Sequence, residues 1–193
     1  MIPLAQIGVF GGSFNPVHCG HTMLASWLAQ FTQLQQVWML LSPENPLKAH
    51  GAADETHRMN MLRMAIGNDP LLKPCDIELH LPRPSYTIHT LRELKQLYPH
   101  YRFRLIIGSD NWQIFNQWRD HDELLRDFTP IIYPRPGYDI DPTTLPPGVT
   151  LVNAPVVDVS STMIRQAIAD GKNMNHFLPA GVYTYIKSHN LYA

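Results

Sequence analysis

The chain has 193 residues, a formal net charge of −1 at neutral pH, and 45% hydrophobic against 16% charged residues. This composition is that of a globular protein with a sizeable core, and the low net charge argues against the basic surface that nucleic-acid binding needs. Its two cysteines form neither a disulfide framework nor a zinc-ligand spacing. We find no signal-peptide pattern and no apolar run of about 18 residues, which predicts a cytoplasmic protein without a membrane span.

Strands and helices are expected to alternate along the whole chain. Strands are predicted at residues 6–10, 36–41, 71–81, 103–107, 130–133 and 149–153. Helices are predicted at residues 22–32, 54–67, 86–97, 122–127, 161–169 and 179–188. This alternation favours one α/β domain over residues 1–193, with a Rossmann-like, doubly wound, mainly parallel sheet and helices on both faces. The part from about residue 160 to 193 is expected to be helical.

Polar residues that could bind a ligand follow most of the predicted strands. In doubly wound sheets, ligands bind beyond the carboxyl ends of the strands. The residues concerned are His18 and His21 after the first strand, Lys48 after the second, Asp110 after the fourth, Arg135 after the fifth, and Ser160 and Ser161 after the last. We therefore expect them to gather at one edge of the sheet.

The glycine-rich stretch at residues 11–21 links the first strand to the first helix. His18 and His21 lie three residues apart at the helix start and so share a face. Gly20 leaves room for a ligand to approach the backbone, and a helix N-terminus favours an anion. The stretch has neither G-x-G-x-x-G nor G-K-[ST] spacing, so a bound dinucleotide cofactor and a Walker loop are not predicted. One histidine alone would usually be structural, but two in this setting favour phosphate binding.

A second cluster opens the predicted helix at 161–169. Ser160, Ser161 and Thr162 carry hydroxyls, and Arg165 lies one turn further along. Serine and threonine are good N-caps, and Arg165 could simply be solvated. The same groups could equally form a phosphate site. The residues alone leave both interpretations open.

Taken together, the His18–His21 and Ser160–Arg165 motifs resemble the paired signatures of the HxGH nucleotidylyltransferase superfamily. The wider chain is similar to its bacterial nicotinate-nucleotide adenylyltransferase branch. This narrower resemblance rests on residues 11–18, Arg58, Pro84-Ser85-Tyr86-Thr87, Ile107-Gly108-Ser109-Asp110, Trp118, Arg135-Pro136-Gly137, Leu178-Pro179 and Leu191-Tyr192.

The resemblance implies a reaction of NAD biosynthesis. AMP would pass from ATP to nicotinate mononucleotide, giving nicotinate adenine dinucleotide and pyrophosphate, by in-line attack of the acceptor phosphate on the α-phosphorus. Such catalysis needs positioning and charge stabilisation, and no protein nucleophile. Mg²⁺ would be carried by the ATP phosphates, with no metal ligand from protein side chains. The implied partners are ATP and nicotinate mononucleotide, without nucleic acid or membrane, and a homo-oligomer is left open.

The resemblance also implies roles for particular residues. Catalytic roles fall to His18, His21, Lys48 and Arg165. Further ATP-binding residues would be Gly11, Gly12, Ser13, Phe14, Gly108, Asp110, Ser161 and Thr162. On the acceptor side, Trp118 would stack on the pyridine ring, Thr87 with Ser85 and Tyr86 would face the nicotinate carboxylate, and Arg135 would meet the acceptor phosphate. Core packing for Trp118, an N-cap for Thr87 and a surface role for Arg135 remain the alternatives.

Two positions depart from the family pattern. Leu47 stands where a histidine is usual, and Asn15 stands where aspartate is common. We therefore expect no polar contact from position 47 and no metal role for Asn15. The open alternatives are transfer to nicotinamide mononucleotide or another phosphorylated acceptor, and a catalytically silent nucleotide-binding domain.

Overall fold

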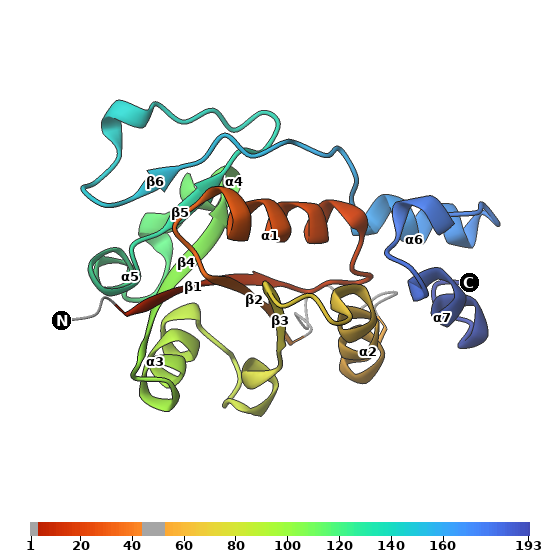
Figure 1. Ribbon diagram of the computed structural model, residues 1–193. Coiled ribbons are helices and arrows are strands. Elements are labelled where there is room, and N and C mark those ends of the chain that lie inside the picture. Colours follow the sequence, from red (N-terminus) through yellow and green to blue (C-terminus); the bar gives the residue numbers. More distant parts are fainter. Residues whose placement is uncertain (1–3, 44–52) are drawn as a thin grey trace.

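A parallel sheet of six strands forms the centre of the computed structural model, which describes residues 4–43 and 53–193 (Figure 1). In spatial order the strands are β3 (Leu72–Cys75), β2 (Gln36–Leu41), β1 (Ala5–Gly12), β4 (Tyr101–Gly108), β5 (Ile131–Tyr133) and β6 (Thr150–Leu151). All neighbouring strands pair in parallel, which confirms the expected Rossmann-like, doubly wound sheet. The strand order reverses between β1 and β4, and such a switch point is where these sheets bind ligands.

The central strands bury both of their faces because they are almost wholly apolar. Along β2, Val37, Met39 and Leu41 belong to one hydrophobic cluster, whereas Trp38 and Leu40 belong to the other. This alternation follows the period of two of an extended strand. A sheet built from such strands needs helices on both faces to exclude water.

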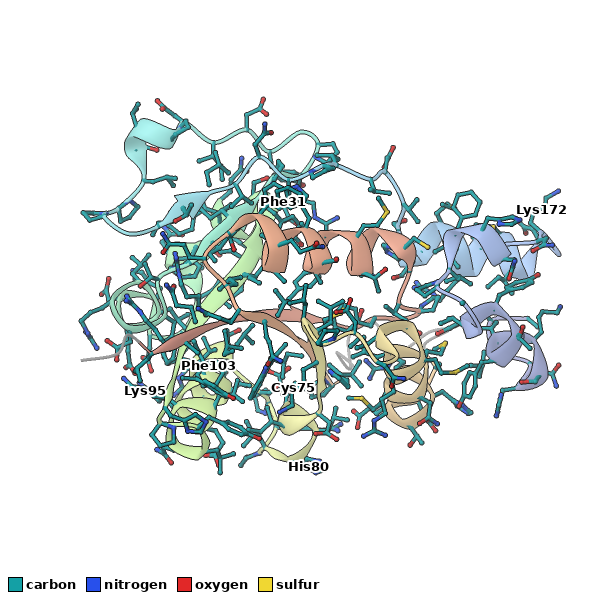
Figure 2. The ribbon with its side chains drawn as sticks, viewed as in Figure 1. Phe31, Cys75, His80, Lys95, Phe103 and Lys172 are labelled. Carbon is teal, nitrogen blue, oxygen red and sulfur yellow. The ribbon has the colours of Figure 1, made fainter. Side chains whose placement is uncertain are left out.

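Helices cover the two faces of the sheet (Figure 1). The first cluster takes residues from α1 (Cys19–Phe31), α2 (Glu55–Ile66), α6 (Ser161–Ala169) and α7 (Val182–Ser188), and the second from α3 (Thr87–Leu97) and α5 (His121–Phe128). Shorter elements are α4 (Ser109–Trp112) and the 3₁₀ helices Ile77–His80, Phe115–Gln117, Pro142–Thr144 and Asn175–Phe177. Phe103 and Cys75 mark the second cluster in Figure 2. Within the described residues, no helix combines the length and apolar character needed to cross a membrane.

The prediction of a strand at 71–81 is wrong in its second half. The strand ends at Cys75, and residues Ile77–His80 form a 3₁₀ helix in which the Leu79 N–H donates to the Asp76 carbonyl. Pro74 already limits pairing, since a proline has no N–H for a ladder, and β3 is accordingly an edge strand. Polar and apolar residues still alternate beyond Cys75, and single side chains such as Glu78 are buried there. The backbone, however, is a 3₁₀ helix and not an extended strand.

Gly171 closes the C-terminal end of α6. Gly171 has φ of +72°, a backbone conformation that glycine adopts without strain. Its N–H donates to the Ile168 carbonyl, and the Lys172 N–H donates to the Ala167 carbonyl. These two bonds form a Schellman motif, which satisfies carbonyl groups that the helix leaves open.

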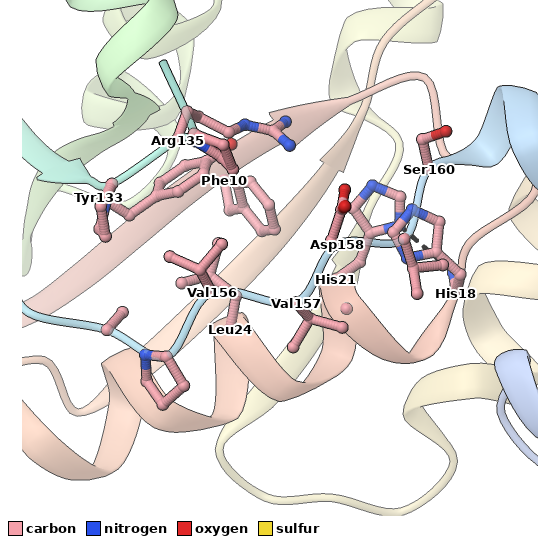
Figure 3. A pocket seen from close by; sticks show the side chains of 16 residues that line it. Phe10, His18, His21, Leu24, Tyr133, Arg135, Val156, Val157, Asp158 and Ser160 are labelled. Atoms are coloured by element: carbon pink, nitrogen blue, oxygen red, sulfur yellow. Dashed lines mark hydrogen bonds between the residues drawn. The ribbon is translucent and has the colours of Figure 1, made fainter. Parts of the chain in front are cut away.

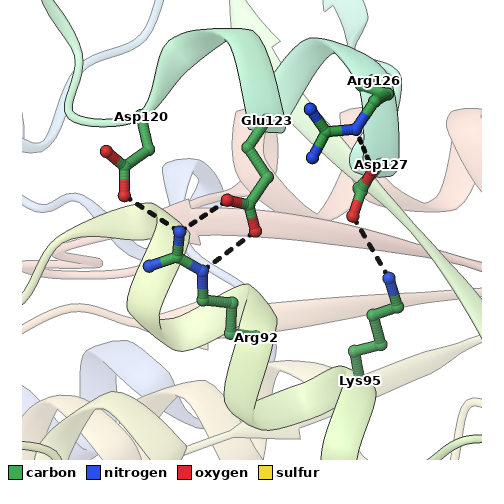
Figure 4. Close-up of polar contacts among 6 residues, drawn as sticks. All are labelled: Arg92, Lys95, Asp120, Glu123, Arg126 and Asp127. Carbon is green, nitrogen blue, oxygen red and sulfur yellow. Dashed lines mark hydrogen bonds and ion pairs between the residues drawn. The ribbon is translucent and has the colours of Figure 1, made fainter.

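Ion pairs join α3 to α5 on the surface (Figure 4). Arg92 of α3 contacts both Asp120 and Glu123, and Lys95 contacts Asp127. The bonds from Arg92 hold the pKa of the half-buried Glu123 carboxyl below its usual value. Exposed ion pairs add little to the stability of a fold. The Arg92 guanidinium, however, contacts two carboxylates and so orients α5 against α3. This matters for the site because Thr87 begins α3 and Trp118 lies shortly before α5.

Candidate active site

The two predicted histidines stack on each other at the start of α1. His18 is the N-cap residue, and its N–H donates to Nδ1 of His21 over 3.2 Å. The His21 N–H donates in turn to the His18 carbonyl over 2.9 Å. The ring centroids lie 3.6 Å apart. These contacts fix both imidazoles along one wall of a pocket at the carboxyl ends of β1 and β5 (Figure 3).

Both imidazoles are neutral at neutral pH. Burial, followed by the nearby Arg135 guanidinium, lowers the pKa of His18 to about 4. Burial, His18 and Arg135 lower the pKa of His21 well below its usual value. Because Nδ1 of neutral His21 accepts a hydrogen bond from the backbone, we assign its proton to Nε2. His21 therefore presents an N–H donor and not a positive charge.

This depressed pKa has a consequence for stability at acid pH. The unfolded chain protonates His18 near its ordinary pKa of 6.5, and the folded protein only near 4. Between these values the unfolded state binds more protons, so the free energy of unfolding falls as the pH drops. At pH 5 the expected loss from His18 is about 2 kcal/mol relative to pH 7.5.

Urea unfolding at both pH values measures this loss, with His18→Asn as the comparison. Asparagine is a good N-cap and does not titrate, so the variant should lose correspondingly less stability on acidification. Equal losses in the wild type and the variant would show that His18 does not carry the effect.

The pocket beside the histidines has an enclosed volume of about 120 Å³. Phe10, Tyr133 and Arg135 line one side, and Ser160 lies at the start of α6 on the other (Figure 3). The structure thus brings residues following β1 and β5 to the same place as the start of α6. Arg135 adds a guanidinium to a wall of neutral donors, which suits an anionic ligand.

The second predicted motif contacts the turn that carries the histidines. Ser160 caps α6 by accepting a bond from the Met163 N–H, which confirms the capping interpretation for this residue. Ser161 Oγ donates to the Pro16 carbonyl over 2.9 Å, and Arg165 Nη1 donates to the Asn15 carbonyl over 2.8 Å. Residues about 150 positions apart in the sequence therefore form one site.

Arg165 also lies near a hydroxyl of its own helix. Its Nη2 donates to Thr162 Oγ1 over 3.3 Å, while Thr162 itself is exposed. Guanidinium and hydroxyl thus stand together beside the turn, at the N-terminal end of α6. Such a set of donors suits the terminal phosphates of a nucleotide.

The Asn15 side chain ties the turn at residues 11–21 to two other parts of the chain. It is buried, and Oδ1 accepts one bond from the Ala53 N–H over 3.2 Å and a second from the Tyr192 hydroxyl over 2.6 Å. Burial raises the pKa of Tyr192, so its hydroxyl stays protonated and donates. An uncharged amide oxygen thus links the turn to the start of α2 and to the C-terminal segment.

Removal of the Tyr192 hydroxyl should loosen this anchor. We expect Tyr192→Phe to lower the free energy of unfolding by about 1 kcal/mol, because one buried hydrogen bond is lost while Ala53 still satisfies Asn15. The KM for ATP should rise several-fold, since the turn is held less firmly. Urea unfolding and steady-state kinetics measure the two effects. Tyr183→Phe is the matched control because its hydroxyl bonds Lys172 far from the turn, and an equal effect there would contradict the anchor role.

Two neighbouring side chains leave little room for a side chain at position 108. A Cβ there would lie 2.3 Å from Asp110 Oδ1 and 3.1 Å from the Arg135 side chain. Asp110 Oδ1 is buried and, among the described residues, has no hydrogen-bond partner, although Arg135 Nε lies 3.8 Å away. This oxygen is available to accept a bond from a ligand hydroxyl.

A second pocket lies at the carboxyl ends of β1, β2 and β4. It brings together Gly11, Gly12 and Gly108 with two residues predicted for the acceptor, Thr87 and Trp118. Trp118 is half-buried with its ring 5.4 Å from that of Phe115, so one side packs on the core while the residue still lines the pocket.

The alternative interpretation of Thr87 as the N-cap of α3 is wrong. Tyr86 is the N-cap residue, and no side chain caps the helix. The His89 N–H donates to the Tyr86 carbonyl, so the backbone N–H groups of Thr87 and Ile88 are the ones open to an anionic group. Ser85 and Tyr86 are not among the described residues that line the pocket, and the Tyr86 ring instead stacks against the guanidinium of Arg119 at 4.7 Å.

Sequence reasoning missed three polar residues of this second pocket, Ser42, Glu78 and Asn111. Glu78 fell inside the predicted strand 71–81, where nothing in the pattern singles it out. Asn111 lies in α4, which is too short to give a periodic signal. Only the burial of Glu78, visible in the structure, could have drawn attention to it.

Comparison with known proteins agrees with this geometry. The family model described as cytidylyltransferase-like matches residues 9–167. A protein of Bacteroides fragilis named probable nicotinate-nucleotide adenylyltransferase is 45% identical over 183 residues, covering 94% of this chain and 90% of that protein. One of Porphyromonas gingivalis with the same name is 46% identical over 174 residues, covering 89% and 88%. The chain belongs to the nicotinate-nucleotide adenylyltransferase family.

A solved structure extends the likeness to three dimensions. The nicotinic acid mononucleotide adenylyltransferase of Plasmodium falciparum, complexed with NaAD, aligns with a TM-score of 0.82 and 25% identity over 97% of each chain. Members of the adenylyltransferase family are nucleotidyltransferases, and this confirms the enzyme class that the sequence resemblance implied.

Two of the predicted positions, Lys48 and Leu47, lie outside the described residues. Phe14 is buried with its ring edge-on to His21 at 5.0 Å, and the Ser13 carbonyl accepts a bond from Arg58. Among residues 4–43 and 53–193, no three histidine, cysteine, aspartate or glutamate side chains are grouped so that they could hold a metal ion.

Proposed function

We propose that this protein transfers AMP from ATP to nicotinate mononucleotide, yielding nicotinate adenine dinucleotide and pyrophosphate. The observation that carries the proposal is the contact between the two motifs: Ser161 and Arg165 bond directly to the turn that presents His18 and His21. The names of the relatives support the same reaction. Because both motifs contribute to one pocket, we treat residues 1–193 as one catalytic unit.

In the proposed reaction the 5′-phosphate of nicotinate mononucleotide attacks the α-phosphorus of ATP. A new P–O bond forms as the bond to the β-phosphate oxygen breaks, and the electron pair leaves with pyrophosphate. The His21 Nε2–H group and the Arg165 guanidinium would stabilise negative charge on the leaving group. The acceptor supplies the nucleophile, so no serine or cysteine is required.

The other residues take supporting roles in this proposal. His18, Gly11, Gly12, Ser13, Phe14, Gly108, Ser161 and Thr162 would surround ATP. Asp110 Oδ1 would accept a bond from a ribose hydroxyl of ATP, for which its lack of a partner in the described part of the chain is the support. Trp118 would stack on the pyridine ring, the open N-terminus of α3 at Thr87 would bind its carboxylate, and Arg135 would meet the acceptor phosphate.

Magnesium fits this site only as a companion of the triphosphate. The described residues offer no group of three ligating side chains, and the pocket wall presents neutral imidazoles, a guanidinium and one carboxylate, that of Asp158. When bound to the phosphates, Mg²⁺ would neutralise part of their charge. The residues of the protein would then orient the phosphates and donate hydrogen bonds to them.

The proposal is tested with purified protein, ATP, Mg²⁺ and nicotinate mononucleotide, by measuring pyrophosphate. We expect turnover, and we expect nicotinate mononucleotide to outcompete nicotinamide mononucleotide at equal concentration, because an open helix N-terminus favours a carboxylate. No pyrophosphate above background would reject the proposed activity. A preference for the amide acceptor would reject the assignment of the substrate.

A further inference from the structure

Glu78 places a buried carboxylate oxygen at the wall of the second pocket. The residue lies in the 3₁₀ helix Ile77–His80 and is 5% exposed. Its Oε1 accepts a hydrogen bond from the Thr90 hydroxyl over 3.0 Å. Its Oε2 is buried and has no hydrogen-bond partner among the described residues. Glu78 lines the pocket together with Thr87 and Trp118.

A buried carboxylate oxygen without a donor is costly. Leaving such a group unpaired carries the full cost of removing it from water, and native structures almost always satisfy it. Thr90 on α3 holds the other oxygen, so the carboxylate is fixed in place. We therefore take the donor for Oε2 to come from the ligand that fills the pocket.

The chemistry of the pocket narrows what this donor can be. A carboxylate repels a second carboxylate, so the acid group of nicotinate would lie away from Oε2, toward the open N-terminus of α3. The pyridine ring carries no N–H group. The pocket runs from Trp118 and Thr87 to Gly11 and Gly12 at the end of β1. In a mononucleotide lying along that path, the ribose comes between the ring and the phosphate and offers two hydroxyl donors.

We propose that Oε2 of Glu78 accepts a hydrogen bond from a ribose hydroxyl of the acceptor mononucleotide. The inference rests on the proposed function, since it concerns the acceptor of the same reaction. It makes Glu78 a specificity-determining residue that selects a ribonucleotide over an acceptor lacking that hydroxyl. Sites that bond a substrate hydroxyl reject analogues without it, because the buried partner is then left unpaired.

The test compares nicotinate mononucleotide with its 2′-deoxy and 3′-deoxy analogues on the wild type and on two variants. In the wild type, one of the two analogues should show kcat/KM lowered by about ten- to hundredfold, as expected for a bond to a charged group. Glu78→Met keeps the volume of the side chain but removes both oxygens. In this variant the ratio of kcat/KM for nicotinate mononucleotide to kcat/KM for that deoxy analogue should approach one. The Thr90 hydroxyl still has the Tyr86 carbonyl at 3.5 Å, which favours a folded variant.

Glu78→Gln keeps an acceptor for Thr90 but removes the charge, and it should show an intermediate ratio. Glu93→Gln is the matched control: it makes the same chemical change on α3, outside the residues that line the pocket, and should keep the wild-type ratio. The KM for ATP should stay unchanged in every variant. A wild type that uses both deoxy analogues as well as the ribonucleotide would overturn the proposal, and so would an unchanged ratio in both Glu78 variants.

Calorimetric binding of nicotinate mononucleotide separates this inference from the proposed function. If the wild type binds it, and Glu78→Met weakens binding of the ribonucleotide but not of the deoxy analogue, the inference holds even without turnover. Turnover without any effect of Glu78 keeps the function and rejects the inference. If neither binding nor turnover occurs, both fail. An effect restricted to nicotinamide mononucleotide would assign Oε2 to the amide and overturn the ribose assignment.

Discussion

Replacement of His21 by alanine should lower kcat by about 10²- to 10³-fold while the protein remains folded. The reason is that the neutral ring contributes an Nε2–H donor, oriented by the bond from the His18 N–H to Nδ1. When an enzyme loses one hydrogen-bond donor to the charge that develops in the transition state, its kcat typically falls by about 10²- to 10³-fold. Pyrophosphate release under saturating ATP and nicotinate mononucleotide measures the effect.

His176→Ala provides the control for this experiment. His176 is exposed in the 3₁₀ helix Asn175–Phe177, and its replacement should leave kcat unchanged. A kcat for His21→Ala close to that of the wild type would remove His21 from the stabilisation of the leaving group. A fall in kcat that is accompanied by loss of the folded circular dichroism spectrum would instead assign His21 a structural role.

Replacement of Arg165 by alanine should lower kcat/KM for ATP by about 10²- to 10³-fold, with much of the change in KM. Arg165 has two effects that the variant removes together. Its charge is proposed to bind the phosphates of ATP, and its Nη1 holds the Asn15 carbonyl at 2.8 Å. A charge-assisted bond to phosphate contributes more than a neutral one, and the loss of alignment adds to it.

Arg165→Lys separates these two contributions. Lysine restores the positive charge but not the planar fork that reaches both Asn15 and Thr162, so activity should recover only in part. Arg126→Ala serves as the control because Arg126 pairs with the neighbouring Asp127 on the surface. An unchanged KM for ATP in Arg165→Ala would contradict a role in binding the triphosphate.

Much of the sheet could be predicted because its strands are continuous apolar runs between polar ends. The predicted bounds of β2 coincide with the observed Gln36–Leu41. The start of α1 was predicted three residues too late, because histidine is not a usual N-cap and His18 gives no capping signal. The second half of the predicted strand 71–81 failed because a buried 3₁₀ turn and a strand can bury side chains at similar intervals.

The two motifs proposed to bind phosphate were easier to single out from the sequence than the residues of the proposed acceptor pocket. His18 with His21, and Ser161 with Arg165, each form a local motif whose chemistry can be read within one helical turn. The Glu78 carboxylate is held by a hydrogen bond from Thr90, twelve residues away, and the Asn15 side chain by one from Tyr192, at a separation of 177 residues. Such contacts follow from the packing of α3, α2 and the C-terminal segment, which no local pattern contains.

The bond between Asn15 and Tyr192 also bears on the order in which the enzyme is made. The turn at residues 11–21 leaves the ribosome first, yet the groups that hold it, Ser161, Arg165 and Tyr192, are translated after every strand of the sheet. A nascent chain could form the central strands early while the proposed phosphate site is still incomplete. If this site binds ATP as proposed, a shortened chain ending before α6 should not transfer AMP from ATP.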